Sequence, residues 1–251
     1  MERSAGPTIT ASSFTNTASG VIGLVACGLA TVTGSGVAPG VAGVVSASLF
    51  GPLPYGLGPI SALSVNGTPA PLSSVSNQNN VQQATFQVPC ETQVGTGTAT
   101  VVLTVSGGTT TISGVPVFAA QPGIFTYLGP GNKVYAAVIR ALDGTYVTPS
   151  SFAHRGETYY VFLTGVGQTS PPASTNNPGN GQATVAQAIV GVNNAGVPVI
   201  SSTYQGGVGV YLVGFQIPQN FQTGPDQPFS VGVILNNLVF YSNSVFIPGV
   251  N

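Results

Sequence analysis

The chain has 251 residues, of which only 4% are charged, and its net charge is −1. An average globular protein has about 25% charged residues, and proteins that bind nucleic acid or anionic membranes carry basic clusters, so both partner classes are excluded. Hydrophobic residues make up 43% of the chain, which is enough to bury a core and excludes a disordered polymer. The 35 Gly and 20 Pro are typical of many short strands joined by turns, and no segment has a helical period. We therefore predict an all-β protein.

The N-terminal region offers two candidate targeting signals, and neither fits. Residues 1–7 lack the apolar segment of a secretory signal. Leu24–Gly28 matches a bacterial lipobox, but the apolar run before it is short and interrupted by glycine, so we favour a strand there. No stretch approaches 18 uninterrupted apolar residues, and the sequence predicts no transmembrane helix. If the protein is exported, we expect its signal upstream of this sequence.

The first half alternates predicted strands with turns. The strands are expected at 28–33, 60–65, 98–106 and 109–118. Asn66-Gly67 is a preferred pair for a type I′ hairpin, because both positions take positive φ. Gly107-Gly108 is expected to be the turn of the last hairpin, and the short join 119–123 predicts that the two halves touch.

The second half continues in the same way. Strands are expected at 124–127, 134–140, 157–164, 187–192, 197–203, 208–217, 229–235 and 238–247. Asp143-Gly144 and Asn236-Asn237 are predicted turns. The segment 168–182 is rich in Pro, Asn and Gly and has no periodicity, so we expect it to be the most flexible part of the chain.

The two halves repeat one pattern. Ala84–Pro89 (ATFQVP) recurs as Val213–Pro218 (VGFQIP), and a turn and β-run precede each copy, while Thr96-Gly97 or Thr223-Gly224 follows. The copies lie about 127–129 residues apart, which suits two domains of one fold rather than a solenoid. With about seven strands per copy, we predict two tandem immunoglobulin-like β-sandwich domains, 8–120 and 121–251. The chain has no Trp, which excludes the antibody type of core.

A series of motifs across residues 8–249 resembles the Solibacter uncharacterised C-terminal domain family of exported acidobacterial proteins. The motifs are 28–39 (GLATVTGSGVAP), Pro52-Leu53-Pro54, 60–67, 86–89, 121–125, Asp143-Gly144-Thr145, Arg155-Gly156-Glu157, Tyr211 with 215–218, and Ser242-Asn243. The resemblance implies a fold similar to the IPT/TIG immunoglobulin-like domains, no assigned activity, and a place at the end of secreted or surface proteins. The chain departs from the family pattern at Ala26-Cys27 and at Cys90.

The residues that carry chemistry in other proteins are scarce. The acids are Glu2, Glu91, Asp143, Glu157 and Asp226. No pair is placed as a glycosidase requires, and Glu91 and Glu157 are interpreted as solvated charges at strand edges. His154 is the only His and is interpreted as a turn residue, so no metal site is expected. No Ser lies in a G-x-S-x-G elbow, and no Gly group completes a dinucleotide-binding motif. We predict no catalytic, cofactor-binding or metal residues and no enzyme activity.

Tyrosines are the candidates for ligand binding. Adjacent Tyr159 and Tyr160 point to opposite faces of their strand, so one of them is expected to be exposed. Tyr159, Tyr160, Tyr204 and Tyr211 are candidate ligand-facing aromatics, but Tyr is an ordinary strand residue and a position in the core is favoured for each.

Cys27 and Cys90 are the only cysteines, and both fall in the predicted first domain. An even pair in a small exported domain favours a disulfide, which would stabilise the domain by about 4 kcal/mol on the chain-entropy model. The alternative is two buried free thiols. Because both positions are departures from the family pattern, the resemblance also favours a bridge.

The sequence therefore favours a non-catalytic structural or adhesive module at the end of a larger extracellular or cell-surface protein. Two alternatives stay open. One is a carbohydrate-binding module with a polysaccharide as its partner. The other is self-association through sheet edges into a fibre or surface array, since few charges protect those edges.

Overall fold

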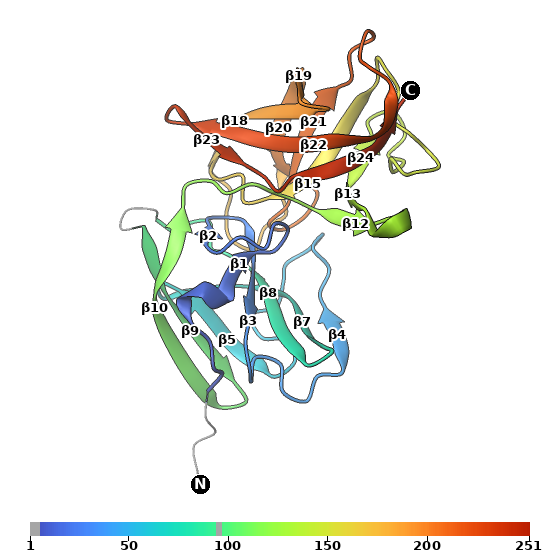
Figure 1. The fold of residues 1–251 in the computed structure, drawn as a ribbon. Helices are drawn as coiled ribbons and strands as arrows, with labels where there is room; N and C mark the ends of the chain where they lie inside the picture. The colour runs from blue at the N-terminus through green and yellow to red at the C-terminus, as the bar shows by residue number, and fades with distance from the viewer. Residues whose placement is uncertain (1–5, 94–96) are drawn as a thin grey trace.

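The protein consists almost entirely of strands and turns (Figure 1). The computed structural model describes residues 6–93 and 97–251. Within them the only helices are two short 3₁₀ turns, η1 (Ala11–Ser13) and η2 (Pro130–Asn132). The predicted all-β class is confirmed. The described residues contain no helix of the length and hydrophobicity that crossing a membrane requires.

Two sheets form the first sandwich, drawn from blue to green in Figure 1. One has the order β1-β3-β8-β7-β4, with β1 (Phe14–Asn16), β3 (Leu29–Thr33), β8 (Val81–Gln87), β7 (Leu72–Gln78) and β4 (Gly43–Ser46). The other has the order β2-β10-β9-β5-β6, with β2 (Leu24–Val25), β10 (Gly108–Phe118), β9 (Thr98–Val105), β5 (Ile60–Val65) and β6 (Thr68–Pro69).

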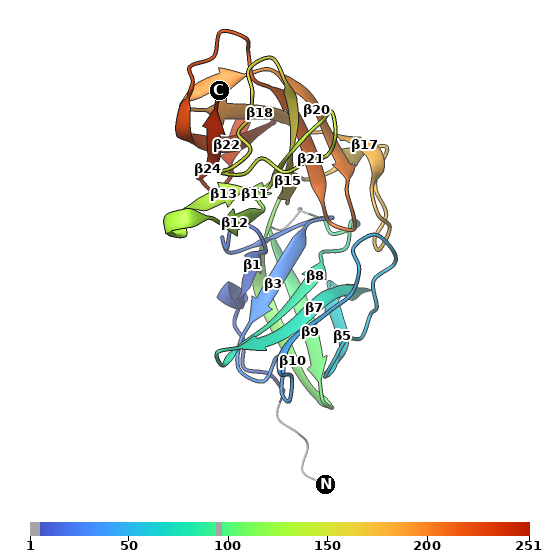
Figure 2. The same cartoon turned by 90° about the vertical axis from the view of Figure 1, so that its right-hand side faces the viewer.

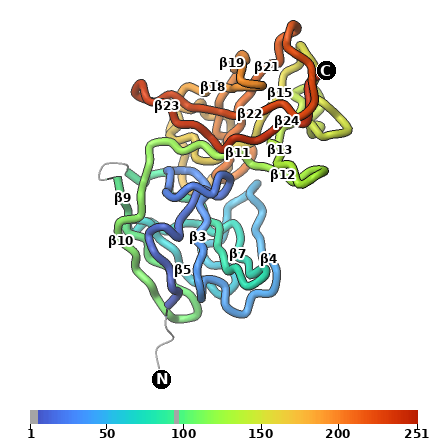
Figure 3. The backbone as a smooth tube through the Cα atoms, in the orientation of Figure 1, coloured from blue at the N-terminus to red at the C-terminus, as the bar shows by residue number. Residues whose placement is uncertain are grey.

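The second sandwich, drawn from yellow-green to red, also has two sheets (Figure 2). One contains β11 (Gly123–Ile124), β14 (Val138–Arg140), β15 (Thr158–Thr164), β21 (Tyr211–Gln216), β20 (Val199–Gln205), β17 (Asn180–Thr184) and β16 (Thr169–Ser170). The other contains β12 (Thr126–Leu128), β13 (Val134–Ala136), β24 (Val245–Val250), β23 (Leu238–Tyr241), β22 (Gly224–Leu235), β18 (Gln187–Val192) and β19 (Ala195–Val197). The chain passes from one sandwich to the other along the green segment after β10 (Figure 3).

Both sandwiches have immunoglobulin-like topology. In the first, β3, β8 and β7 hold the places of strands B, E and D, and β10, β9, β5 and β6 those of G, F, C and C′. In the second, β15, β21 and β20 correspond to B, E and D, and β24, β22, β18 and β19 to G, F, C and C′. Each also has a short strand parallel to its G strand, β2 beside β10 and β13 beside β24. The predicted tandem immunoglobulin-like sandwiches are confirmed.

The repeated motif lies at the same place in both copies. Gln87 closes β8 opposite Leu29, and Gln216 closes β21 opposite Thr158. The turns also repeat: Asn66 and Gly67 both have positive φ, as do Asn193 and Asn194. Thr96, which belongs to the Thr-Gly motif of the first copy, lies outside the described residues.

Each sandwich has its own apolar core between its two sheets. In the first core, the buried rings of Phe14 and Phe86 pack edge to face with centroids 6.4 Å apart. In the second, Phe215 packs on Tyr159 at 5.9 Å and on Phe229 at 5.3 Å. Alternating burial along β9 and β15 places these cores where the period-2 pattern predicts them.

The structure differs from several predicted elements. The turn of the last hairpin in the first sandwich is Ser106-Gly107, one residue earlier than predicted, and Gly108 already pairs with Val105. The runs predicted at 124–127 and 134–140 are each split between the two sheets. The chain crosses from sheet to sheet at Phe125 and Ala137, where the Ala137 N–H donates to the Phe125 carbonyl at 2.7 Å. A continuous apolar pattern carries no sign of such a crossing.

The type I′ turn gives a direct test of the hairpin. Gly67 has φ +80° and open space around its missing side chain, so Gly67→Ala tests backbone strain alone. We expect it to lower the free energy of unfolding by about 1 kcal/mol. Gly196 in β19 also faces open space but has no positive φ, so Gly196→Ala is the matched control and should be neutral or slightly stabilising. Urea titrations measure both, and equal effects would contradict the turn assignment.

Candidate functional site at the junction of the two sandwiches

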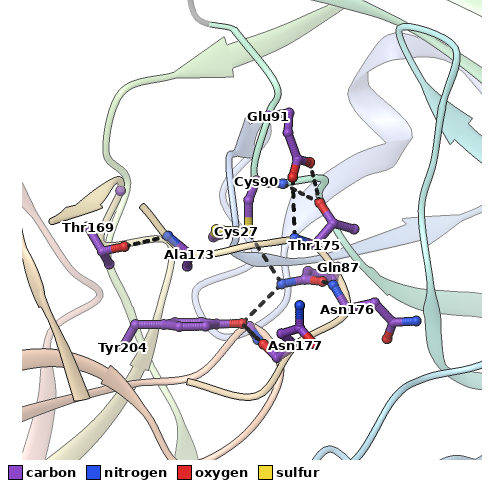
Figure 4. Close-up of a disulfide and its surroundings, with 12 residues drawn as sticks. Cys27, Gln87, Cys90, Glu91, Thr169, Ala173, Thr175, Asn176, Asn177 and Tyr204 are labelled. Atoms are coloured by element: carbon purple, nitrogen blue, oxygen red, sulfur yellow. Dashed lines mark hydrogen bonds between the residues drawn. A yellow bond between two sulfur atoms is a disulfide. The ribbon is translucent and has the colours of Figure 1, made fainter. Parts of the chain in front are cut away.

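A disulfide lies at the junction of the two sandwiches (Figure 4). Cys27 and Cys90 are bonded, their Cα atoms are 4.2 Å apart, and the bridge links positions 63 apart in the sequence. Both residues belong to the first half of the chain. Cys27 is nevertheless buried in the core cluster of the second sandwich, and the half-buried Cys90 packs against the same cluster. The bridge therefore helps to form the surface on which the second sandwich rests.

The duplicated fold explains why these two cysteines meet. The Cys27 N–H donates to the Val88 carbonyl at 3.0 Å, and the Gly156 N–H donates to the Ile217 carbonyl at 2.7 Å in the second sandwich. Cys27 and Gly156 are thus equivalent, and both have positive φ. A Cβ atom at Gly156 would overlap the side chain of Gln219, which is the equivalent of Cys90. The fold brings this pair of positions together in both copies. An alignment of the two copies of the sequence therefore indicates that Cys27 and Cys90 lie close together.

The buried amide of Gln87 joins the sandwiches next to the disulfide (Figure 4). Its Nε2 donates to the Tyr204 hydroxyl at 3.0 Å and to Cys90 Sγ at 3.7 Å, and its Oε1 accepts the Asn176 N–H at 2.7 Å. The Tyr204 hydroxyl also accepts the Gly209 N–H at 2.8 Å and donates to the Asn177 carbonyl at 3.1 Å. All the hydrogen-bonding capacity of this hydroxyl is used. Gln87 is thus satisfied largely by groups of the second sandwich.

The segment 168–179 of the second sandwich lies along this network. Thr175 donates its hydroxyl to the Glu91 carboxylate and accepts the Cys90 N–H at 2.8 Å. The Asn176 side chain accepts the Leu53 N–H at 2.6 Å and donates to the Leu53 carbonyl at 2.9 Å. Segment 168–182, predicted to be the most flexible one, is tied to the first sandwich by these bonds of Thr175 and Asn176. The Pro and Asn residues of this segment belong to turns that contact the first sandwich.

Glycines let the two backbones approach closely at the same junction. The Leu29 N–H donates to the Thr164 hydroxyl, which in turn donates to the Gly209 carbonyl, both at 2.7 Å. A Cβ atom at Gly209 would lie 2.6 Å from Leu29 Cγ, and one at Gly28 would lie 3.1 Å from the Gly165 Cα. Larger residues at these positions would push the sandwiches apart. The predicted contact between the two halves is confirmed.

Three of the four candidate ligand-facing tyrosines, Tyr159, Tyr204 and Tyr211, are buried, so they occupy the core position that the sequence favoured and face no ligand. Their hydroxyls find partners inside the protein: Tyr159 binds Glu157 at 2.6 Å, and Tyr211 donates to the Gly167 carbonyl at 2.7 Å. Burial, with the hydrogen bond to Glu157, raises the pKa of Tyr159 to about 12. Burial likewise raises the pKa values of Tyr204 and Tyr211. Tyr160 points to the opposite face and is half-buried.

The sequence predicts that Glu91 and Glu157 are solvated charges at strand edges. In the structure, both also have partners within the protein. Burial raises the pKa of Glu91, but the hydrogen bonds from the Thr175 side chain and backbone outweigh this and hold the pKa below its usual value. Glu157 lies 3.4 Å from Nε of Arg140 and accepts the Tyr159 hydroxyl. Both carboxylates therefore have structural partners.

Two further carboxylates also have partners within the protein. Asp226 pairs with Lys133 and accepts the Tyr135 hydroxyl at 2.6 Å, which raises the pKa of Tyr135 to about 12. Asp143 accepts the Thr145 N–H in its turn, and the His154 backbone N–H binds the Tyr159 hydroxyl. Glu2 lies outside the described residues. In the parts of the chain that are described, no three His, Cys, Asp or Glu residues come together as a metal site would need.

Two exposed aromatics that were not predicted lie at the junction. Tyr241 is 68% exposed, Phe118 is 38% exposed, and both line the same hollow. Neither residue was predicted from the sequence. The alternation along a strand does not show which of its side chains remain exposed next to a second sandwich. The junction therefore has a rigid polar interior and an apolar outer groove.

Comparisons with known proteins give no family. No family model and no curated protein matches the chain. Among solved structures, a titin A168–A169 fragment is 11% identical, with 98% of each chain covered and a TM-score of 0.24. The C-terminal domain of the Streptococcus agalactiae AgI/II polypeptide BspA is 9% identical, with 90% of this chain and 95% of that chain covered and a TM-score of 0.21. At these TM-scores the superpositions bear on neither fold nor function.

Thiol reactivity tests the disulfide, and substitutions at Cys27 test the left-handed backbone conformation at that position. Unfolded, unreduced protein should show no reactive thiol, and reduction should cost about 4 kcal/mol of stability. In a Cys90→Ala background, Cys27→Gly should be about 1 kcal/mol more stable than Cys27→Ala, because Gly relieves the left-handed φ of 63°. Thiol titration and urea unfolding measure these outcomes. Two reactive thiols per unfolded chain would contradict the bridge.

The Gln87 network is tested by comparing the two copies of the repeated glutamine. Gln87→Ala leaves the Asn176 N–H without a partner, removes one of the three hydrogen bonds of the Tyr204 hydroxyl and opens a cavity, so we expect a loss of about 3 kcal/mol. Gln216 is half-buried and donates only to the Gly156 carbonyl of its own sandwich, at 3.1 Å. Gln216→Ala should therefore cost about 1 kcal/mol. Denaturant unfolding checks both variants, and a smaller loss for Gln87→Ala than for Gln216→Ala would show that the network does not join the sandwiches.

Proposed function

We propose that the protein is a non-catalytic structural or adhesive module of an extracellular or cell-surface protein, in which two sandwiches act as one rigid unit. The observation that carries the proposal is the buried Gln87 amide, whose partners Tyr204 and Asn176 both come from the other sandwich. Separation would exchange these bonds for bonds to water, at a net cost of about 0.5–1.5 kcal/mol each, and would expose the apolar contact around Cys27, so the two sandwiches resist separation. A joint of this kind suits a spacer that holds neighbouring domains in a fixed direction.

Several features support the extracellular placement. The Cys27–Cys90 bridge requires an oxidising compartment to persist. The resemblance to C-terminal modules of exported acidobacterial proteins implies the same location. The ionisable side chains of the junction are engaged in structural contacts, as Glu91 with Thr175 illustrates, which favours a scaffold over an enzyme.

Calorimetry tests the rigid unit. We expect wild-type protein to unfold in one transition with equal calorimetric and van't Hoff enthalpies, because separating the sandwiches exposes the Gln87 network. Two resolved transitions would contradict the proposal.

The same preparation should hydrolyse no glycoside, ester or peptide substrate. An activity lost on replacing Glu91, Asp143, Glu157 or Asp226 would make the protein an enzyme.

One observation favours self-association as a second candidate function. Strand β4 forms a sheet edge, all four of its residues are exposed, and neither a charge nor a proline protects it. Such an edge can pair with the same edge of another molecule. Sedimentation at high concentration tests this: wild-type protein should associate, and Val45→Lys should be monomeric. A strict monomer would exclude the fibre or array.

A further inference from the structure

A hollow of 320 Å³ opens on the outside of the junction, and both sandwiches contribute to it. The first contributes Val21 and Phe118, the join contributes Gln121, and the second contributes Phe240 and Tyr241. Among the described residues, no charged side chain lines it. The hollow is held in shape by the junction, because Asn243, on its wall, binds both the N–H and the carbonyl of Ile124, at 2.8 and 3.2 Å.

Tyr241 presents one face of its ring to solvent. It lies on β23 directly across from Gly232 of β22, and a Cβ atom at Gly232 would lie 3.3 Å from Tyr241 Cδ1. The absence of a side chain at Gly232 lets the ring lie against the strand backbone. Because the residue is nevertheless 68% exposed, the opposite face of the ring is free.

Phe118 is held in a similar way on the other wall. A Cβ atom at Gly23 would overlap its ring, so only glycine allows the ring to occupy this place. Gly23 also has φ +127°, a conformation that other residues rarely adopt. Two aromatic rings, each packed on a glycine, thus line one hollow from opposite sandwiches.

The polar groups of the hollow are neutral, and some lack partners within the described chain. Gln121 donates from Nε2 to the Ile22 carbonyl at 3.0 Å, while its Oε1 is buried and has no hydrogen-bond partner in the described chain. The Tyr241 hydroxyl, on the exposed ring, has no partner there either. A free hydroxyl beside two aromatic rings suits a ligand that combines apolar faces with hydroxyl groups.

We propose that this hollow binds a neutral polysaccharide, whose equatorially substituted pyranose rings stack on Tyr241 and Phe118 and whose hydroxyls bond the Tyr241 hydroxyl. The C–H faces of such sugars are apolar, while their edges carry donors and acceptors. An acidic polysaccharide would find no counter-charge here. A purely apolar protein segment that covered Tyr241 would remove its hydroxyl from water without a partner, at a cost in free energy. The ligand is thus defined by neutrality, flat apolar faces and hydroxyl groups.

Affinity electrophoresis tests the proposal with gels that contain hydroxyethylcellulose, xylan or galactomannan, and with polygalacturonate as the acidic control. Wild-type protein should be retarded in at least one neutral gel and not in polygalacturonate. Tyr241→Ala should weaken binding by about tenfold or more through loss of the stacking face. Phe118→Leu keeps the apolar volume without the ring and should weaken binding as well. Tyr241→Phe keeps the stacking face and should retain most of the binding.

Tyr146→Ala is the matched control, because Tyr146 is 56% exposed but does not line the hollow, so its removal should change nothing. No retardation of wild-type protein in any neutral gel, or equal retardation of Tyr241→Ala, overturns the proposal. So does a wild-type dimer in sedimentation that Tyr241→Ala dissociates, because the hollow would then be an interface between copies. The rigid-module proposal is tested separately by calorimetry and survives either result.

Discussion

The junction depends on a single buried amide that its own sandwich does not satisfy. Gln87 ends β8, and burial there removes its donors and acceptor from water. The compensating partners are the Tyr204 hydroxyl and the Asn176 N–H, and they require the second sandwich to be in place. A partial opening that broke these bonds without admitting water would cost more than a typical hydrogen bond contributes, and full separation would also expose the apolar contact around Cys27. Segment 168–179 lies against the same network, because it supplies the Asn176 N–H.

Duplication of one fold has produced two different uses of one motif. Gln216 occupies the same place in the second sandwich as Gln87 in the first, yet it donates to Gly156 of its own sandwich. At the position of Gly156, the first copy has Cys27, whose bridge to Cys90 forms part of the contact surface. In the first copy, the end of the E strand therefore contacts the other sandwich through Gln87. In the second copy, the equivalent Gln216 bonds within its own sandwich.

Local patterns predicted the architecture well and the junction poorly. The Asn66-Gly67 turn, the long hairpins and the repeat were readable because neighbouring residues determine them. The hydrogen bond between Tyr204 and Gln87 was not, since the two residues lie 117 positions apart and belong to different sandwiches. The sheet crossings at Phe125 and Ala137 were missed for a related reason, because a strand that changes sheets keeps the same apolar alternation. Residues whose partners lie across a domain boundary carry no local signal.

The position of the disulfide has a mechanical consequence. Its two cysteines enclose most of the strands of the first sandwich, including β3, β5, β7 and β8. If tension along the chain unravelled this sandwich, the residues between Cys27 and Cys90 would stay closed in a loop and bear no load. At about 3.4 Å per extended residue, the bridge withholds about 200 Å of contour length. A tether built from this module would therefore lengthen in a short, covalently limited step.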